Sequence, residues 1–129
     1  MTDSTAPRLV SSTHEPDAEI GPGIRRYVRV LLENWGVDAE IIEDGLIVVE
    51  ELVANVVDHA QTRFALTIQL SSLVLRIAVH DECVADPVLR PFDPHAGRGR
   101  GLQLIESLSQ QWGCDHHHGG KTVWADLAA

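Results

Sequence analysis

Cysteine is scarce in this 129-residue chain, which holds only Cys83 and Cys114. Two cysteines make no disulfide framework, so we expect the fold to depend on an apolar core in a reducing compartment; a single bond between them stays open. The chain also lacks a secretory signal peptide and any apolar run long enough to cross a membrane. We therefore expect a cytoplasmic protein without a membrane partner.

Basic residues are few as well. Ten lysines and arginines stand against 19 acidic residues, and the formal net charge is −9. This balance argues against non-specific binding to nucleic acid or anionic membrane, which requires a basic patch. A bound anion is still compatible, because backbone N–H groups at a helix start can outweigh the global charge. An apolar content of 44% fits one domain over residues 1–129, with a loose start at 1–7.

The hydrophobic pattern predicts an α+β fold. Apolar residues recur at helical spacing in three segments and alternate with polar residues in others. The segment 82–98 contains prolines and has no periodic pattern of apolar residues, which predicts a loop. Loops of this length are usually functional. We expect helices on one face of a mainly antiparallel mixed sheet, a two-layer α/β sandwich. The expected strands are 8–12, 64–70, 73–81 and 121–127, the helices 23–34, 38–59 and 101–111, and a hairpin turn covers 114–120.

The second predicted helix carries a polar stripe. Glu51, Asn55 and His59 are spaced four residues apart and therefore share one face. A solvated face is the simpler interpretation, but asparagine is a poor residue for a helix interior. Its amide oxygen suits Mg²⁺, and a carboxylate one turn earlier suits a general base for phosphoryl transfer. The stripe is thus a candidate catalytic face.

Asp81 ends the third predicted strand on its buried side, since it continues the alternation of Leu75, Ile77 and Val79. A buried carboxylate needs hydrogen-bond donors. Backbone N–H groups of the following loop would satisfy it structurally, and a ligand such as an exocyclic amine would satisfy it functionally. The residue alone leaves these two alternatives equal.

A glycine-rich segment precedes the third predicted helix. Gly97, Gly99 and Gly101 allow backbone N–H groups to approach an anion, and the helix start adds positive potential. Arg98 and Arg100 have the length and charge to reach phosphate oxygens. A flexible linker is the commoner explanation of such a segment, but its position before Leu102 at a helix start favours a phosphate site.

Five motifs in this order resemble the GHKL ATPase superfamily, with its Bergerat nucleotide-binding fold. The resemblance covers about residues 8–127 and is strongest to anti-sigma-factor serine kinases and related small ATP-binding regulators of actinobacteria. The matching motifs are E-x-x-x-N-x-x-x-H-A at 51–60, V-x-D at 79–81, G-R-G-L-x-L-I at 99–105, W-G at 112–113 and G-K-T-V-W-A-D-L at 120–127.

This resemblance implies ATP and Mg²⁺ as ligands and assigns roles to the matching positions. Glu51 would be the catalytic base, Asn55 the Mg²⁺ ligand, and Asp81 the residue that binds adenine. His59 would line the site, and Lys121 would lie with Thr122 on the strand beside it. The remaining cofactor-binding residues would be Arg98, Gly99, Arg100, Gly101, Leu102 and Thr122.

The chain departs from the family after Asp81. Relatives have D-x-G-x-G, whereas Cys83 and Ala85 replace both glycines here. Glycine permits close backbone approach and unusual dihedral angles. The two side chains are therefore expected to border the adenine pocket and to affect ATP affinity more than the fold.

The resemblance implies a protein serine kinase that phosphorylates an anti-anti-sigma partner of the STAS type and binds a sigma factor. The altered loop supports an alternative, a regulatory module that binds a protein partner with little or no nucleotide. Relatives often dimerise, so a homodimer is one expected state. A metal site at residues 114–118 is a third hypothesis, but we favour a polar turn there because neighbouring histidines on an extended chain face opposite sides.

Overall fold

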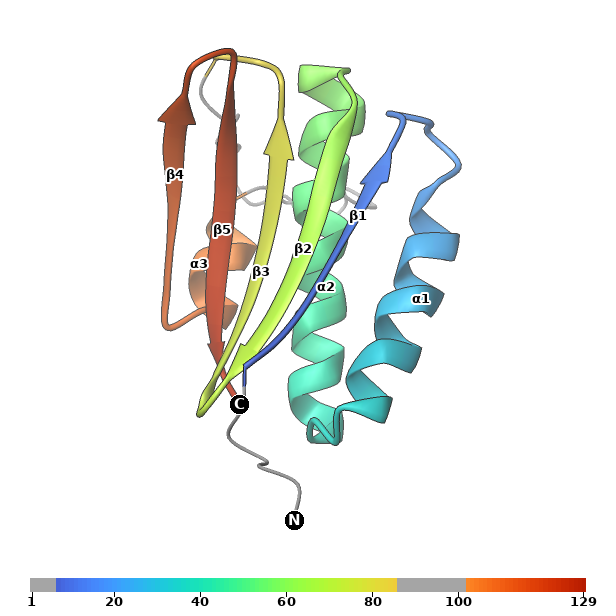
Figure 1. Ribbon diagram of the computed structural model, residues 1–129, viewed down its shortest axis with the longest axis vertical. Helices are drawn as coiled ribbons and strands as arrows, with labels where there is room; N and C mark the ends of the chain where they lie inside the picture. The colour runs from blue at the N-terminus through green and yellow to red at the C-terminus, as the bar shows by residue number, and fades with distance from the viewer. Residues whose placement is uncertain (1–6, 86–101) are drawn as a thin grey trace.

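In the part of the chain that the structure describes, five antiparallel strands form an open sheet, and the helices lie on one of its faces (Figure 1). The computed structural model describes residues 7–85 and 102–129. The strands are β1 (Arg8–His14), β2 (Phe64–Ser71), β3 (Val74–Asp81), β4 (Gln111–His117) and β5 (Gly120–Ala128), arranged in the order β1-β2-β3-β5-β4. All four strand pairs are antiparallel. The predicted α+β sandwich is confirmed.

Among the described residues, three α-helices make the second layer: α1 (Gly21–Asn34), α2 (Ala39–Asn55) and α3 (Leu102–Leu108). The central helix α2 packs against both α1 and α3 and also contacts β3 and β5. The first helix ends at Asn34, as predicted, and Gly36 follows it with a φ of 75°, in the left-handed region that glycine adopts easily. The covered position of α2 explains why it is apolar on more than one side.

The core lies between the sheet and the helices. Alternate residues of the strands face inward, and those of β2, β3 and β5 are buried in one core cluster with apolar residues of the helices. Period-two patterning therefore identified these strands correctly. The inward residues are Phe64, Leu66, Ile68, Leu75, Ile77, Val79, Val123, Ala125 and Leu127.

The segment before the last strand differs from the prediction. Residues 114–117 belong to β4, and the hairpin turn is confined to the two residues between β4 and β5. The third helix ends at Leu108 instead of 111, because Gln110 already donates its N–H to the carbonyl of Asp126. A strand at the edge of a sheet is mostly exposed and needs no alternation of apolar and polar residues. Its sequence therefore gives little indication of a strand.

The second helix also ends differently from the prediction. The α-helical geometry stops at Asn55, and residues Val56–Ala60 form one π-helical turn, η1. Gln61 then adopts a left-handed conformation, and its N–H bonds to the carbonyl of Val56. His59 is consequently displaced from the stripe that ideal helical spacing predicted. Single π turns within α-helices often accompany functional sites.

Candidate functional site

A cavity of about 220 Å³ opens at one end of the sandwich. The last turn of α2 and η1 form one wall, and the end of β3 with the start of β5 forms the other. Three separate segments therefore contribute to a single site. Five residues predicted from the sequence line this cavity together: Asn55, His59, Asp81, Cys83 and Ala85.

The helix wall carries the polar stripe. Glu51 is 5% exposed, so the solvated-face interpretation is wrong for this residue. It lies one helical turn before Asn55, which borders the cavity, whereas His59 lies in η1 and is exposed. The Nδ2 atom of Asn55 is buried and has no hydrogen-bond partner in the described parts of the chain. A buried N–H donor without an acceptor is unfavourable, and an acceptor on a ligand would satisfy it.

The strand wall is centred on Asp81, which strand parity placed correctly on the inner face. This residue is only 2% exposed. Its Oδ1 atom accepts the backbone N–H of Cys83 at 2.9 Å. The structural alternative for Asp81, a carboxylate satisfied by its own loop, is thus realised in part. One backbone donor does not balance a buried negative charge, so a cation is required nearby.

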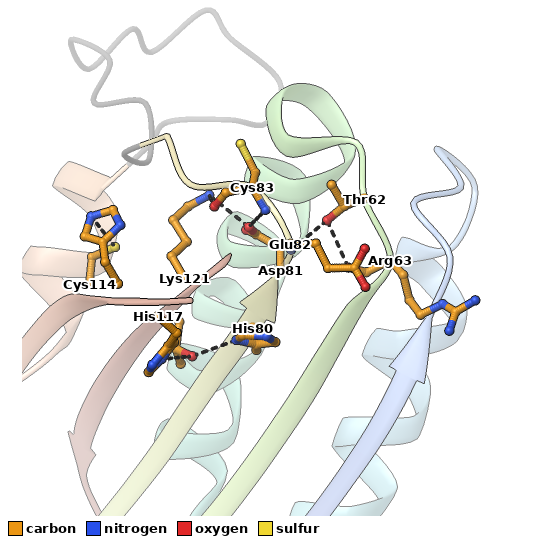
Figure 2. A network of polar contacts seen from close by, with 11 residues as sticks. Thr62, Arg63, His80, Asp81, Glu82, Cys83, Cys114, His117 and Lys121 are labelled. Atoms are coloured by element: carbon orange, nitrogen blue, oxygen red, sulfur yellow. Dashed lines mark hydrogen bonds and ion pairs between the residues drawn. The ribbon is translucent and has the colours of Figure 1, made fainter. Parts of the chain in front are cut away.

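That cation is Lys121, directly opposite Asp81 in the β3–β5 pairing. Its Nζ lies 3.0 Å from Asp81 Oδ1 and 3.3 Å from the carbonyl oxygen of Cys83. Figure 2 shows the three residues grouped at the ends of the two strands. From the sequence, Lys121 was expected beside the site but not as the ion-pair partner of Asp81. The alternation of β5 could have indicated this role, because Lys121 faces inward together with Val123, Ala125 and Leu127.

Thr122 does not belong to the cavity, and this prediction is corrected. It alternates with Lys121 and therefore faces the other side of the sheet, away from the helices. Its hydroxyl lies 3.1 Å from Nδ1 of His80 and 3.0 Å from Nε2 of His117. The strand alternation also separates His116 from His117, and no metal-binding group of three ligands exists among the residues at 7–85 and 102–129.

Gly120 makes a close backbone contact that supports the strand wall. A Cβ atom at this position would collide with the carbonyl oxygen of Asp81 and crowd the following residue, Glu82. Only glycine allows β5 to start so near the end of β3. The absence of a side chain here therefore helps to bring Lys121 within ion-pair distance of Asp81.

Part of the predicted phosphate site lies outside the described residues, namely Arg98, Gly99, Arg100 and Gly101. Leu102 is placed in the first turn of α3, where it is 4% exposed and packs in the core. It acts there as an apolar anchor for the helix. Both cysteines are free thiols.

A second cavity, of about 200 Å³, lies between the start of α1 and the middle of α2. Its lining is mostly apolar, and Arg25 and Glu50 are its charged residues. The first cavity offers the richer set of groups, because an amide, a carboxylate and an ammonium meet there. We therefore assign the candidate site to the first cavity.

Comparison with known proteins supports the assignment of the fold. Residues 14–127 match the model of the histidine kinase-like ATPase domain, and the chain belongs to this family. The crystal structure of the RsbU and RsbW domains of Rv1364c from Mycobacterium tuberculosis aligns with a TM-score of 0.68 and 20% identity. The alignment covers 94% of this chain and 32% of that one. A search among curated proteins found no significant match.

None of the helices within residues 7–85 and 102–129 is long and apolar enough to pass through a lipid bilayer.

Proposed function

We propose that this chain binds ATP and Mg²⁺ and acts as a protein serine kinase that regulates a sigma factor. The observation that carries the proposal is the meeting of Asn55 and Asp81 at one cavity, with Glu51 one helical turn away. Membership of the histidine kinase-like ATPase family supports the same ligand class. The site, its ligands and the reaction are proposals on this basis.

The donor set of the cavity fits a nucleotide with Mg²⁺. Asn55 supplies an amide oxygen, the hard ligand that Mg²⁺ prefers, and its orphaned Nδ2 suits a phosphate oxygen. Bound there, the ion would neutralise negative charge that develops on the phosphates during transfer. Asp81 is a buried acceptor at the opposite wall and suits the exocyclic amine of adenine.

Glu51 is proposed as the general base. It is buried one helical turn before Asn55, and its carboxylate is suited to accept the proton of a serine hydroxyl that attacks a phosphoryl group. Positioning on a packed helix holds the carboxylate in one place, which is what a general base requires.

The proposed protein partners are a STAS-type anti-anti-sigma protein, as phosphate acceptor, and a sigma factor. The similar structure contains an RsbW domain, which makes regulators of this kind the first partners to test. A homodimer is proposed as well. A partner-binding regulator with weak nucleotide affinity is the second candidate, favoured by the ion pair that already engages Asp81.

Phosphate transfer is the decisive measurement. The chain would be incubated with Mg²⁺, γ-labelled ATP and candidate anti-anti-sigma proteins, each paired with a variant that lacks the acceptor serine. We expect label on the intact partner only. Glu51→Gln preserves the shape of the side chain and should slow transfer by about 10²- to 10⁴-fold while ATP still binds. Protein that binds ATP but labels no partner would count against the kinase reaction, whereas folded protein that does not bind ATP would support the second candidate.

A further inference from the structure

Lys121 is the only lysine in the sequence, and it is buried at the candidate site. Its side chain is 5% exposed, although an ammonium group is among the most costly groups to remove from water. An ammonium has three N–H donors. Within the described residues, two of them have acceptors, Asp81 Oδ1 and the carbonyl of Cys83. The third is available to a ligand in the cavity that Lys121 lines.

The carboxylate of Asp81 also uses only part of its capacity to accept hydrogen bonds. Both recorded donors to Asp81, the ammonium of Lys121 and the N–H of Cys83, bond to the same oxygen, Oδ1. That oxygen has two lone pairs, so it is saturated. Within residues 7–85 and 102–129, no hydrogen bond reaches Oδ2. The wall of the cavity therefore presents one free acceptor beside one free donor.

A single acceptor beside a single donor matches one edge of adenine, where the exocyclic amine lies next to the ring nitrogen N1. Guanine presents two adjacent N–H donors beside its carbonyl and would need both carboxylate oxygens. We propose that Lys121 is a base-recognition residue: its ammonium donates a hydrogen bond to N1 of adenine while Asp81 Oδ2 accepts from the amine. This inference rests on the proposed nucleotide-binding function and assigns that site its base specificity.

The competing possibility is that the ammonium of Lys121 only fills space and neutralises the charge of Asp81, without contacting the ligand. In that case a nucleotide would have to displace Lys121 from Asp81, and loss of the ammonium would strengthen binding. The two possibilities predict opposite effects of the same substitution. They also differ in whether binding depends on the nitrogen atom N1 of the ligand.

Calorimetry on the full chain with Mg²⁺ provides the test. ATP would be compared with GTP and with 1-deaza-ATP, in which a C–H group replaces N1. We expect both analogues to bind at least about tenfold more weakly than ATP, the usual effect of losing one hydrogen bond to a charged group. Equal binding of ATP and 1-deaza-ATP would overturn the role of Lys121 and leave ATP binding intact. If folded protein shows no ATP binding, the proposed nucleotide site itself is wrong.

Lys121→Met completes the cycle, because methionine keeps most of the apolar side chain without the charge. This variant should bind ATP and 1-deaza-ATP equally and weakly; tighter ATP binding would overturn the proposal. Arg76→Met, which removes a cation from the outer face of the sheet, is the matched control and should keep the wild-type preference. The ligand comparison on unmodified protein decides the matter even if Lys121→Met does not fold.

The single lysine allows a direct observation as well. Nitrogen-labelled lysine gives one side-chain ammonium signal in NMR spectra. That signal should shift with ATP and shift differently with 1-deaza-ATP, because only ATP offers N1 as an acceptor. Identical shifts with the two ligands would count against the contact.

Discussion

Asp81 and Lys121 face each other across β3 and β5 and form a 3.0 Å ion pair that is almost completely shielded from water. Strands far apart in the sequence supply the two charges. Such pairs seldom increase stability over apolar packing, because desolvation offsets most of the attraction. Their position at the wall of a cavity makes a binding role the better explanation of why the charges are there.

Removal of one partner from this pair should be costly. Asp81→Asn leaves the ammonium of Lys121 buried without a counter-charge, and we expect the free energy of unfolding to fall by about 3 kcal/mol or more. The double variant Asp81→Asn with Lys121→Met should regain much of this loss. Urea denaturation of the four proteins in the cycle measures the coupling. A loss in the double variant equal to the sum of the two single losses would show that the pair is not energetically coupled.

Asn55→Ala should separate binding from stability. Because Nδ2 of Asn55 has no partner in the described residues, the substitution removes no protein hydrogen bond from that atom. We expect the unfolding free energy to change by less than about 1 kcal/mol, while nucleotide binding loses its dependence on Mg²⁺. Thermal unfolding and calorimetry with and without Mg²⁺ measure the two effects. Glu50→Ala on the same helix is the control, and an unchanged Mg²⁺ effect in Asn55→Ala would reject the metal assignment.

Gly120→Ala should damage both the fold and the cavity. The added methyl would overlap the carbonyl oxygen of Asp81, and backbone atoms have little room to move. We expect a loss of about 2–3 kcal/mol, typical of an overpacked site, together with weaker ATP binding. Gly23→Ala is the matched control, since its Cβ would meet no atom within 4 Å and alanine favours a helix. Equal stability of the two variants would contradict the close contact.

A carboxylate on the outer face of the sheet, Asp126, is expected to make the stability of the fold depend on pH. Asp126 is held by two hydrogen bonds from Arg76, at 2.7 and 2.9 Å, and by one from Gln111. The bonds from Arg76 are the main cause that lowers the pKa of Asp126 below the ordinary value of 3.8, against the opposite effect of burial. Arg76 also stacks on the ring of Trp124 at 4.3 Å.

The sign of this effect follows from linkage. Because the pKa of Asp126 is lowered in the folded state, its contribution to stability is present above the ordinary pKa and is lost as the pH falls through the lowered one. Asp126→Asn should therefore flatten the loss of stability in acid. Urea unfolding at a series of acidic pH values measures this. A slope as steep as that of the unmodified chain would show that another carboxylate is responsible.

Much of the architecture was predictable from local patterns. Strands β2 and β3 alternate between apolar and polar residues because one face packs against helices, and that alternation is visible without a structure. Strand β4 was missed because it lies at an edge and is mostly exposed, so only pairing with β5 defines it. The π turn after Asn55 was missed for a similar reason, since its residues fit a regular α-helix equally well.

The candidate site likewise has features that local sequence patterns predict and features that only tertiary contacts decide. By itself, the sequence determined the inward direction of Asp81 and the common helix face of Glu51 and Asn55, because both follow from the repeat of a single element. Only the tertiary structure decided that Glu51 is buried, since that depends on helices packing around α2. It also decided that Lys121, rather than Thr122, meets Asp81, because the pairing of β3 with β5 brings their side chains to one face.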